Sequence, residues 1–184
     1  VEYNENGAYH DEKTPDFSGL AAAASSADVI LLCIGENSYC ETPGNTTDIN
    51  LSANQKELVR RAAATGKPVV LVLNGGRARV ISDVEPLAAA VVDILLPGNE
   101  GGNALADLLS GDENFSGRMP YTYPRHVSSL STYDYKASQK TGTMAGAYDY
   151  NADVSCQWPF GYGMSYTTFA YGTLKPSATE FRNG

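Results

Sequence analysis

The amino-acid sequence predicts an α/β fold in which a mainly parallel sheet is flanked by helices (an α/β sandwich) and followed by an irregular C-terminal segment. Three apolar runs of strand length, at residues 29–34, 69–73 and 91–96, carry this prediction. The first two runs do not alternate polar with apolar positions, which is typical of strands buried on both faces of a parallel sheet. Helical segments separate the runs, and this order favours parallel pairing.

The first predicted helix, at residues 16–26, is short and rich in alanine. The strand at residues 29–34 then leads into a long polar loop, residues 35–51. In open parallel sheets, the loops that leave the carboxyl ends of the strands carry function. The loop at residues 35–51 is therefore the first place to look for a site, followed by the turns at residues 74–79 and 97–103.

The second predicted helix has both a start signal and a stop signal. Ser52 and Gln55 have the spacing of a capping box, in which the two side chains satisfy free backbone N–H groups at a helix start. Apolar side chains follow at helical spacing, and Gly66 ends the helix. Pro68 then opens the strand at residues 69–73.

The remaining elements are shorter. Residues 86–90 resemble a brief helical stretch before the strand at residues 91–96. A helix at residues 103–110 has an apolar side and is stopped by Gly111. Residues 121–171 are rich in Tyr, Ser, Gly and Thr and contain few apolar runs. This segment is expected to cross the surface irregularly rather than to build a second core.

Composition narrows the classes of function. The chain has 184 residues, 42% hydrophobic and 18% charged, which suits one globular domain. Its net charge of −8 repels phosphate backbones, so we expect no nucleic-acid partner. The apolar runs are far shorter than the ~20 residues of a spanning helix, so we expect no membrane partner either.

No sequence signature indicates a cofactor or a metal. Cys33, Cys40 and Cys156 lack metal-ligand spacing, and Cys33, within an apolar run, is expected to be a small buried hydrophobe. The glycines form neither a phosphate-binding loop nor a dinucleotide fingerprint, and the nucleophile elbow of serine hydrolases is absent. We therefore expect no cofactor and no metal.

The loop at residues 35–51 contains two carboxylates, Glu36 and Glu41, at the carboxyl end of a strand. A carboxylic acid on an exposed loop meets the needs of general acid catalysis, including the protonation of a leaving glycosidic oxygen. Spacing alone favours the simpler interpretation, a solvated loop with two ordinary glutamates. We expect Glu36, one residue past the strand, to be held by the strand end, and Glu41 to be exposed.

Four ordered stretches resemble glycoside hydrolase family 3, of the β-glucosidase and exo-β-glucanase type. The string GENSYCETPGNTTDINLSANQKELV is similar to the loop that bears the family's acid/base glutamate, and Glu41 matches that glutamate. The other stretches are GKPVVLVLNGGRARVI, LLPGNEGGNALADLLSGDENFSGRMPYTYP and WPFGYGMSYTTF. Together the likeness spans roughly residues 16–171. The chain departs from many members at Asn45, Gly75 and Ala78, where Asp, Glu and Pro are common.

The resemblance implies a function as well as a fold. Residues 1–170 would be the C-terminal α/β sandwich domain, lacking its N-terminal part, and residues 171–184 a lead-in to a fibronectin-III-like domain. Glu41 would be the catalytic acid/base of a retaining, exo-acting β-glucosidase that hydrolyses β-linked glucosides or oligosaccharides. The nucleophilic aspartate would lie on a preceding barrel domain of the same protein, so this fragment alone is expected to be inactive. The family implies a secreted or periplasmic location.

Two other classes remain open from the sequence. The domain could be a non-catalytic carbohydrate-binding or scaffold module that has kept the fold and lost the chemistry. The departures at Asn45 and Gly75 are the only features that favour this alternative. A free-standing Rossmann-like ligand-binding protein is the third class, and the missing phosphate motifs count against it.

Overall fold

The computed structural model describes residues 15–129, 133–134, 155–178 and 180 of the chain. Three helices, two 3₁₀ turns and five strands occur among these residues. In chain order they are α1 (Leu20–Ser25), β1 (Ile30–Gly35), η1 (Thr42–Gly44), α2 (Ala53–Ala64), β2 (Val69–Asn74), η2 (Glu85–Leu87), β3 (Ala90–Leu95), α3 (Gly101–Ser110), β4 (Tyr123–Pro124) and β5 (Cys156–Trp158).

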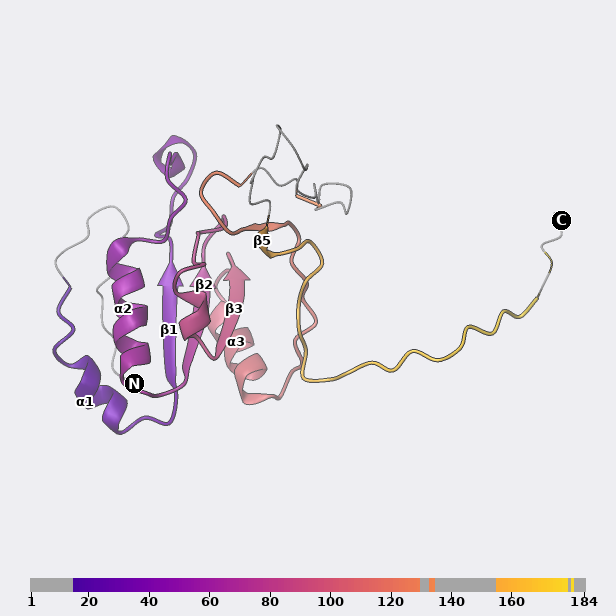
Figure 1. Ribbon diagram of the computed structural model, residues 1–184, viewed down its shortest axis with the longest axis horizontal. Coiled ribbons are helices and arrows are strands. Elements are labelled where there is room, and N and C mark those ends of the chain that lie inside the picture. Colours follow the sequence, from indigo (N-terminus) through magenta and orange to yellow (C-terminus); the bar gives the residue numbers. More distant parts are fainter. Residues whose placement is uncertain (1–14, 130–132, 135–154, 179, 181–184) are drawn as a thin grey trace, which may run out of the picture.

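The central sheet is parallel and has the strand order β1-β2-β3. Helices α2 and α3 flank it, as the α/β prediction requires (Figure 1). Each of the three strands lies within one residue of its predicted bounds at either end. β4 and β5 form a separate antiparallel pair beyond the sheet. The predicted fold class is confirmed.

The core lies between the sheet and α2. It contains alternate residues of β1 and β2 (Leu32, Ile34, Val69, Leu71, Leu73), residues of α2 (Val59, Ala62), and Leu51, Ile81, Val84 and Tyr123 from connecting segments. The alternate residues share one face because β1 and β2 are in register, with Leu32 opposite Leu71. Burial of this apolar surface is the main force that orients α2 on the sheet.

The start of α2 is joined to the end of β1. Ser52 caps the helix, its Oγ accepting the N–H of Gln55 at 3.2 Å, as the capping motif predicts. The buried Gln55 amide reaches further, accepting the N–H of Gly35 at 2.9 Å and donating to its carbonyl at 3.0 Å. Both ends of the intervening loop are therefore fixed to the same rigid body.

The expectation that β1 and β2 are both buried on both faces is wrong for β1. Only β2, the central strand, is largely buried, whereas β3 has no fully buried residue. On β1, Leu31 is 44% exposed, and Cys33 is exposed rather than a buried hydrophobe. The reason is positional, because β1 is an edge strand and no described residue covers the face that carries Leu31 and Cys33.

Two helical predictions need correction. The first helix is limited to Leu20–Ser25, because the residues before it form a turn in which the Asp16 carboxylate accepts the Ser18 N–H at 2.8 Å. The stretch at residues 86–90 is not a helix of that length: a 3₁₀ turn, Glu85–Leu87, is followed directly by β3, which begins at Ala90. The helix stop at Gly111 is confirmed, with a left-handed φ of 86°.

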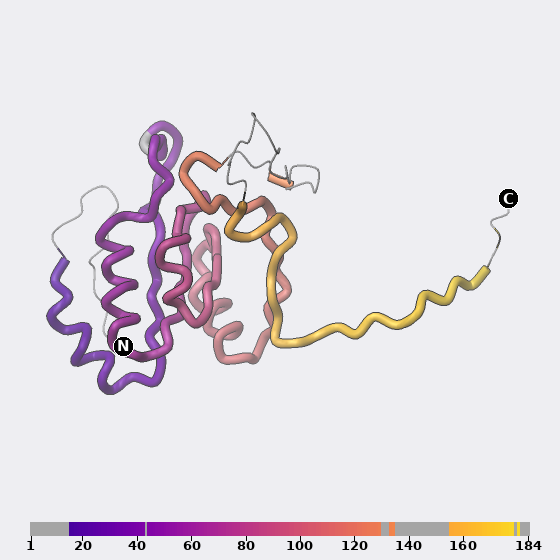
Figure 2. Tube along the Cα trace, viewed as in Figure 1, coloured from indigo at the N-terminus to yellow at the C-terminus, as the bar shows by residue number. Residues whose placement is uncertain are grey.

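Apart from β4 and β5, the described residues after Gly111 form no helix or strand, as the prediction of an irregular C-terminal segment requires, whereas residues 130–132 and 135–154 of that segment lie outside the described residues. Tyr166 fixes part of the C-terminal segment to α3, with its hydroxyl donating to the Leu108 carbonyl at 2.8 Å and its N–H donating to Asn114 Oδ1 at 3.0 Å. The Tyr166 ring also packs edge-on against Phe115. Beyond this point the chain runs away from the domain (Figure 2), and Tyr171 is 96% exposed.

Candidate functional site

The loop between β1 and α2, residues 36–51, rises beyond the carboxyl end of the sheet (Figures 1 and 2). We call it the Glu41 loop. Its two glutamates lie in opposite surroundings: the side chain of Glu36 is 2% exposed, whereas Glu41 is exposed. Glu36 continues the sheet, because its N–H donates to the Asn74 carbonyl at 2.8 Å. The expected contrast between the two residues is confirmed.

Glu36 is held by two arginines from the segment that follows β2. Its Oε1 accepts the Arg79 Nε at 2.9 Å and also pairs with Arg79 Nη2 and, at 3.2 Å, with Arg77 Nε. The Arg79 side chain is only 6% exposed, and its Nη1 donates to the Asp48 carbonyl at 2.7 Å. A buried carboxylate is tolerated when opposite charges and hydrogen bonds compensate its desolvation. Glu36 thus joins two loops and is not available to a ligand.

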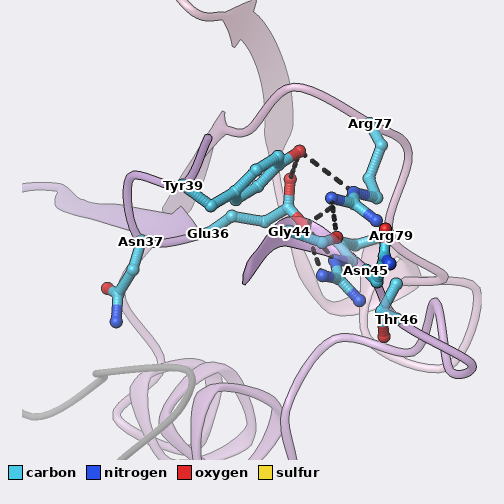
Figure 3. Close-up of a pocket in the computed structure, with 8 residues that line it drawn as sticks. All are labelled: Glu36, Asn37, Tyr39, Gly44, Asn45, Thr46, Arg77 and Arg79. Carbon is cyan, nitrogen blue, oxygen red and sulfur yellow. Dashed lines mark hydrogen bonds and ion pairs between the residues drawn. The ribbon is translucent and has the colours of Figure 1, made fainter. Parts of the chain in front are cut away.

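Tyr39 completes this network (Figure 3). Its hydroxyl donates to Glu36 Oε2 at 3.1 Å and accepts Arg77 Nε at 3.0 Å. The guanidinium carbon of Arg77 lies 4.5 Å from the centre of the Tyr39 ring, a cation–π geometry. Arg77 also donates through Nη2 to the Gly44 carbonyl at 2.5 Å.

Glu41 has an unusual backbone. Its φ of 53° and ψ of −133° lie in a region that residues with a side chain rarely occupy. The residue immediately precedes η1, where the N–H of Gly44 donates to the Glu41 carbonyl at 2.9 Å. Such conformations cost about 1–3 kcal/mol and persist only when the surroundings enforce them. Strain of this kind is concentrated at functional sites.

The Glu41 carboxylate forms no hydrogen bond or ion pair with any residue that the structure describes. It therefore remains open to a ligand that approaches the loop. An exposed carboxyl group in this position can donate a proton to a bound molecule or accept one from it.

The pocket beside these residues is not a sugar-sized site. It is lined by Glu36, Asn37, Tyr39, Gly44, Asn45, Thr46, Arg77 and Arg79, and Glu41 is not among them. The hydrogen-bonded side chains of the network fill most of this pocket, and the space that remains holds about one water molecule. The hollow is therefore the inside of a structural network.

Two further polar side chains, Asp93 and Tyr123, lie next to Arg77 and Arg79. Asp93, on β3, accepts the N–H of Leu95 at 3.1 Å, and burial raises the pKa of its carboxyl above the ordinary value. Tyr123 is 2% exposed, and burial likewise raises the pKa of its phenol. Both side chains line a small hollow that Arg77 and Arg79 also line.

Sequence reasoning identified Glu36 and Glu41 and missed Tyr39, Arg77 and Arg79. One signal in the sequence points to the arginines, because Arg77 and Arg79 lie in the turn after the second predicted strand, at the carboxyl end of the sheet. Among the described residues, no group of three or more His, Cys, Asp or Glu side chains could hold a metal ion. No helix in that part of the chain is long and apolar enough to span a membrane.

The sequence matches the Glycosyl hydrolase family 3 C-terminal domain over residues 8–166. A lysosomal beta glucosidase of Dictyostelium discoideum is 38% identical over 82% of this chain and 17% of its own length. A periplasmic beta-glucosidase of Salmonella typhimurium is 36% identical over 88% of this chain and 22% of its own length. A beta-xylosidase of Formosa agariphila is 33% identical over 89% of this chain and 23% of its own length.

Solved structures agree. A β-glucosidase from Erythrobacter marinus superposes with a TM-score of 0.71 at 34% identity, over 85% of this chain and 21% of that one. The beta-glucosidase from Listeria innocua in complex with isofagomine gives 0.69 at 29% identity, over 80% and 22%. This chain thus spans about a fifth of the length of these relatives. It belongs to glycoside hydrolase family 3, as a C-terminal domain of that family.

Proposed function

We propose that this chain is the acid/base-bearing domain of a retaining, exo-acting β-glucosidase, in which Glu41 is the general acid/base. One observation carries the assignment: Glu41 is the free carboxylate of its loop, whereas Glu36 is enclosed by two arginines. The strained backbone of Glu41 and the β-glucosidase names of several relatives support it.

The reaction proceeds in two displacements. Glu41 first protonates the glycosidic oxygen while an aspartate of a preceding barrel domain attacks the anomeric carbon and the leaving group departs. Glu41, now ionised, then takes a proton from water, which attacks the glycosyl-enzyme and releases the sugar with its configuration retained. In retaining enzymes the two carboxyl groups lie about 5–5.5 Å apart. The barrel must therefore dock against the carboxyl end of this sheet.

This division of labour makes the isolated 184-residue chain inactive, because it supplies the acid and not the nucleophile. The substrate is a β-linked glucoside or oligosaccharide, and the xylosidase names among the relatives keep xylosides as the second sugar to test. In domain terms, residues 1–170 form the α/β sandwich. Residues 171–184 lead toward a fibronectin-III-like domain, in keeping with the exposure of Tyr171.

The parent protein acts outside the cytosol, in a secreted or periplasmic setting. Two relatives support this placement by their names, one periplasmic and one lysosomal.

The test uses the full-length protein and a series of β-glucosides whose leaving groups differ in basicity. Glu41→Gln should lower kcat/KM by ~10²–10⁴ for a basic leaving group, which needs protonation, and by much less for an activated aryl glucoside. In Glu41→Ala, azide should partly restore turnover by replacing water at the glycosyl-enzyme. Glu113→Gln, which neutralises an exposed carboxylate after α3, is the control.

Equal activity of Glu41→Gln and the control on every substrate would contradict the acid/base assignment. Binding of a β-glucoside without turnover by the unaltered full-length protein would favour the alternative of a non-catalytic carbohydrate-binding or scaffold module.

A further inference from the structure

Tyr39 lies two residues before Glu41. Its ring packs so closely against Gly44 and Gly76 that neither position has room for a side chain. A Cβ atom built on Gly44 would lie 2.3 Å from Cδ2 of the Tyr39 ring. A Cβ atom on Gly76, in the turn after β2, would lie 2.9 Å from the Tyr39 hydroxyl. Neither glycine has a positive φ. Close approach of the ring, rather than backbone conformation, is therefore what requires a glycine at both positions.

The remaining sides of the ring are polar or charged. The Arg77 guanidinium covers one face, and the hydroxyl bridges Arg77 Nε and the buried Glu36 carboxylate. The same arginine donates to the Gly44 carbonyl. Tyr39 and Gly44 are thus held against each other and against Arg77, which belongs to a different loop.

The chain between these two fixed points contains Glu41. Tyr39 does not belong to the apolar core between the sheet and α2, so its contacts serve the loop. Residues 39–44 form a short arch whose two ends are fixed. Such an arch can hold Glu41 at φ 53° and ψ −133°, whereas a loop that is free at one end would relax to a less strained conformation.

We propose that Tyr39 is a positioning residue: by packing on Gly44 under Arg77, it fixes residues 39–44 as an arch that aims the Glu41 carboxylate. This inference rests on the proposed acid/base role of Glu41. It adds that the acid is placed by a tyrosine and an arginine from two neighbouring loops.

The sharpest test is Gly44→Ala in the full-length protein. Gly44 has no positive φ, so alanine can adopt the same backbone conformation. The variant therefore acts mainly by displacing the Tyr39 ring from its contact with residue 44. Misplacement of a catalytic group by about 1 Å can cost ~10²-fold in rate. We expect a loss of about that size in kcat/KM for a basic leaving group, and a clearly smaller one for an activated aryl glucoside.

Gly19→Ala is the matched control, because a Cβ atom there meets nothing within 4 Å, φ is −80°, and the residue lies at the start of α1, outside the loops at the carboxyl end of the sheet. It should retain unaltered activity on both substrates. Tyr39→Phe should show the pattern of Gly44→Ala in weaker form, since it keeps the ring and removes the hydrogen bonds to Glu36 and Arg77.

The double variant separates positioning from simple damage. In a Tyr39→Ala background the ring is gone, so Gly44→Ala should have almost no further effect on kcat/KM or on Tm. Independent losses that multiply in the double variant would overturn the proposal. The proposal would also be overturned if Gly44→Ala and Tyr39→Phe lowered kcat/KM equally for both leaving groups. An equal loss indicates a smaller fraction of folded protein rather than a misplaced acid.

Glu41→Gln in the same assay keeps the two hypotheses apart. If Glu41→Gln lacks the leaving-group dependence, the acid/base assignment fails, and the positioning role fails with it. If Glu41→Gln shows the dependence and the Tyr39 and Gly44 variants do not, only the positioning role is wrong.

Discussion

The phenol of Tyr123 satisfies both backbone polar groups of Arg79. Its hydroxyl donates to the Arg79 carbonyl at 2.8 Å and accepts the Arg79 N–H at 3.2 Å. Tyr123 is 2% exposed and comes from β4, in the segment after α3. This segment therefore stabilises the backbone from which Arg79 reaches Glu36, beneath the Glu41 loop.

Tyr123→Phe should lower the free energy of unfolding by roughly 1–3 kcal/mol, because it removes a partner from two buried backbone groups while it keeps the ring. Urea denaturation monitored by far-UV circular dichroism measures the change. Tyr171→Phe, at a position 96% exposed, should stay within about 0.5 kcal/mol of the unaltered chain. Equal stability of the two variants would mean that the Tyr123 hydroxyl contributes nothing.

Stability should also decline at alkaline pH. Burial raises the pKa of the Tyr123 phenol above its ordinary value of 10.0, so the folded state favours the neutral form. The contribution is complete below about pH 10, where the unfolded phenol is also neutral, and is lost as pH rises above that value. The stability difference between the unaltered chain and Tyr123→Phe should narrow as pH rises above about 10. A constant difference would contradict the prediction.

Glu36→Gln should destabilise the chain by about 3 kcal/mol, because it leaves the buried Arg79 guanidinium without its counter-charge. Thermal and urea unfolding both report the change. The matched control is Glu57→Gln on α2, where the exposed pair with Arg61 should be worth about 0.5 kcal/mol or less. Similar effects of the two substitutions would show that the ion pairs of Glu36 are as weak as a surface pair.

The positions of the strands could be predicted from the sequence better than the burial and the long-range partners of individual side chains. Apolar runs locate β1, β2 and β3 because strand formation depends on local composition. The exposure of Cys33 could not be predicted, because it depends on what covers the edge strand. The partnership of Glu36 with Arg79 was also out of reach, since the two residues are 43 positions apart and no local pattern links them. The exposure of Glu41 was predicted because it followed from loop position alone.

Asp93→Asn should stabilise the chain at neutral pH. Burial raises the pKa of this carboxyl, so the folded state disfavours its charged form. Asparagine keeps an oxygen that can accept the Leu95 N–H and has no charge to desolvate. The gain should be largest near pH 7 and should shrink as pH falls toward the carboxyl pKa, where aspartic acid becomes neutral too. Urea unfolding at about pH 7 and about pH 4 tests the prediction, and a gain that grows on acidification would contradict it.

The backbone of Glu41 makes a prediction that separates strain from chemistry. Glu41→Gly and Glu41→Ala both remove the carboxylate, so in the full-length protein both should lose the acid/base function that we propose for Glu41. They should differ in stability, because glycine adopts a φ of 53° without strain and alanine keeps a Cβ atom. We expect Glu41→Gly to be more stable than Glu41→Ala by about 1 kcal/mol, the part of the strain that exceeds glycine's entropic cost. Differential scanning calorimetry of the two variants measures the difference. If alanine proved equally stable, the arch between Tyr39 and Gly44 would be relaxing to another conformation, and those residues would not be enforcing the geometry of Glu41.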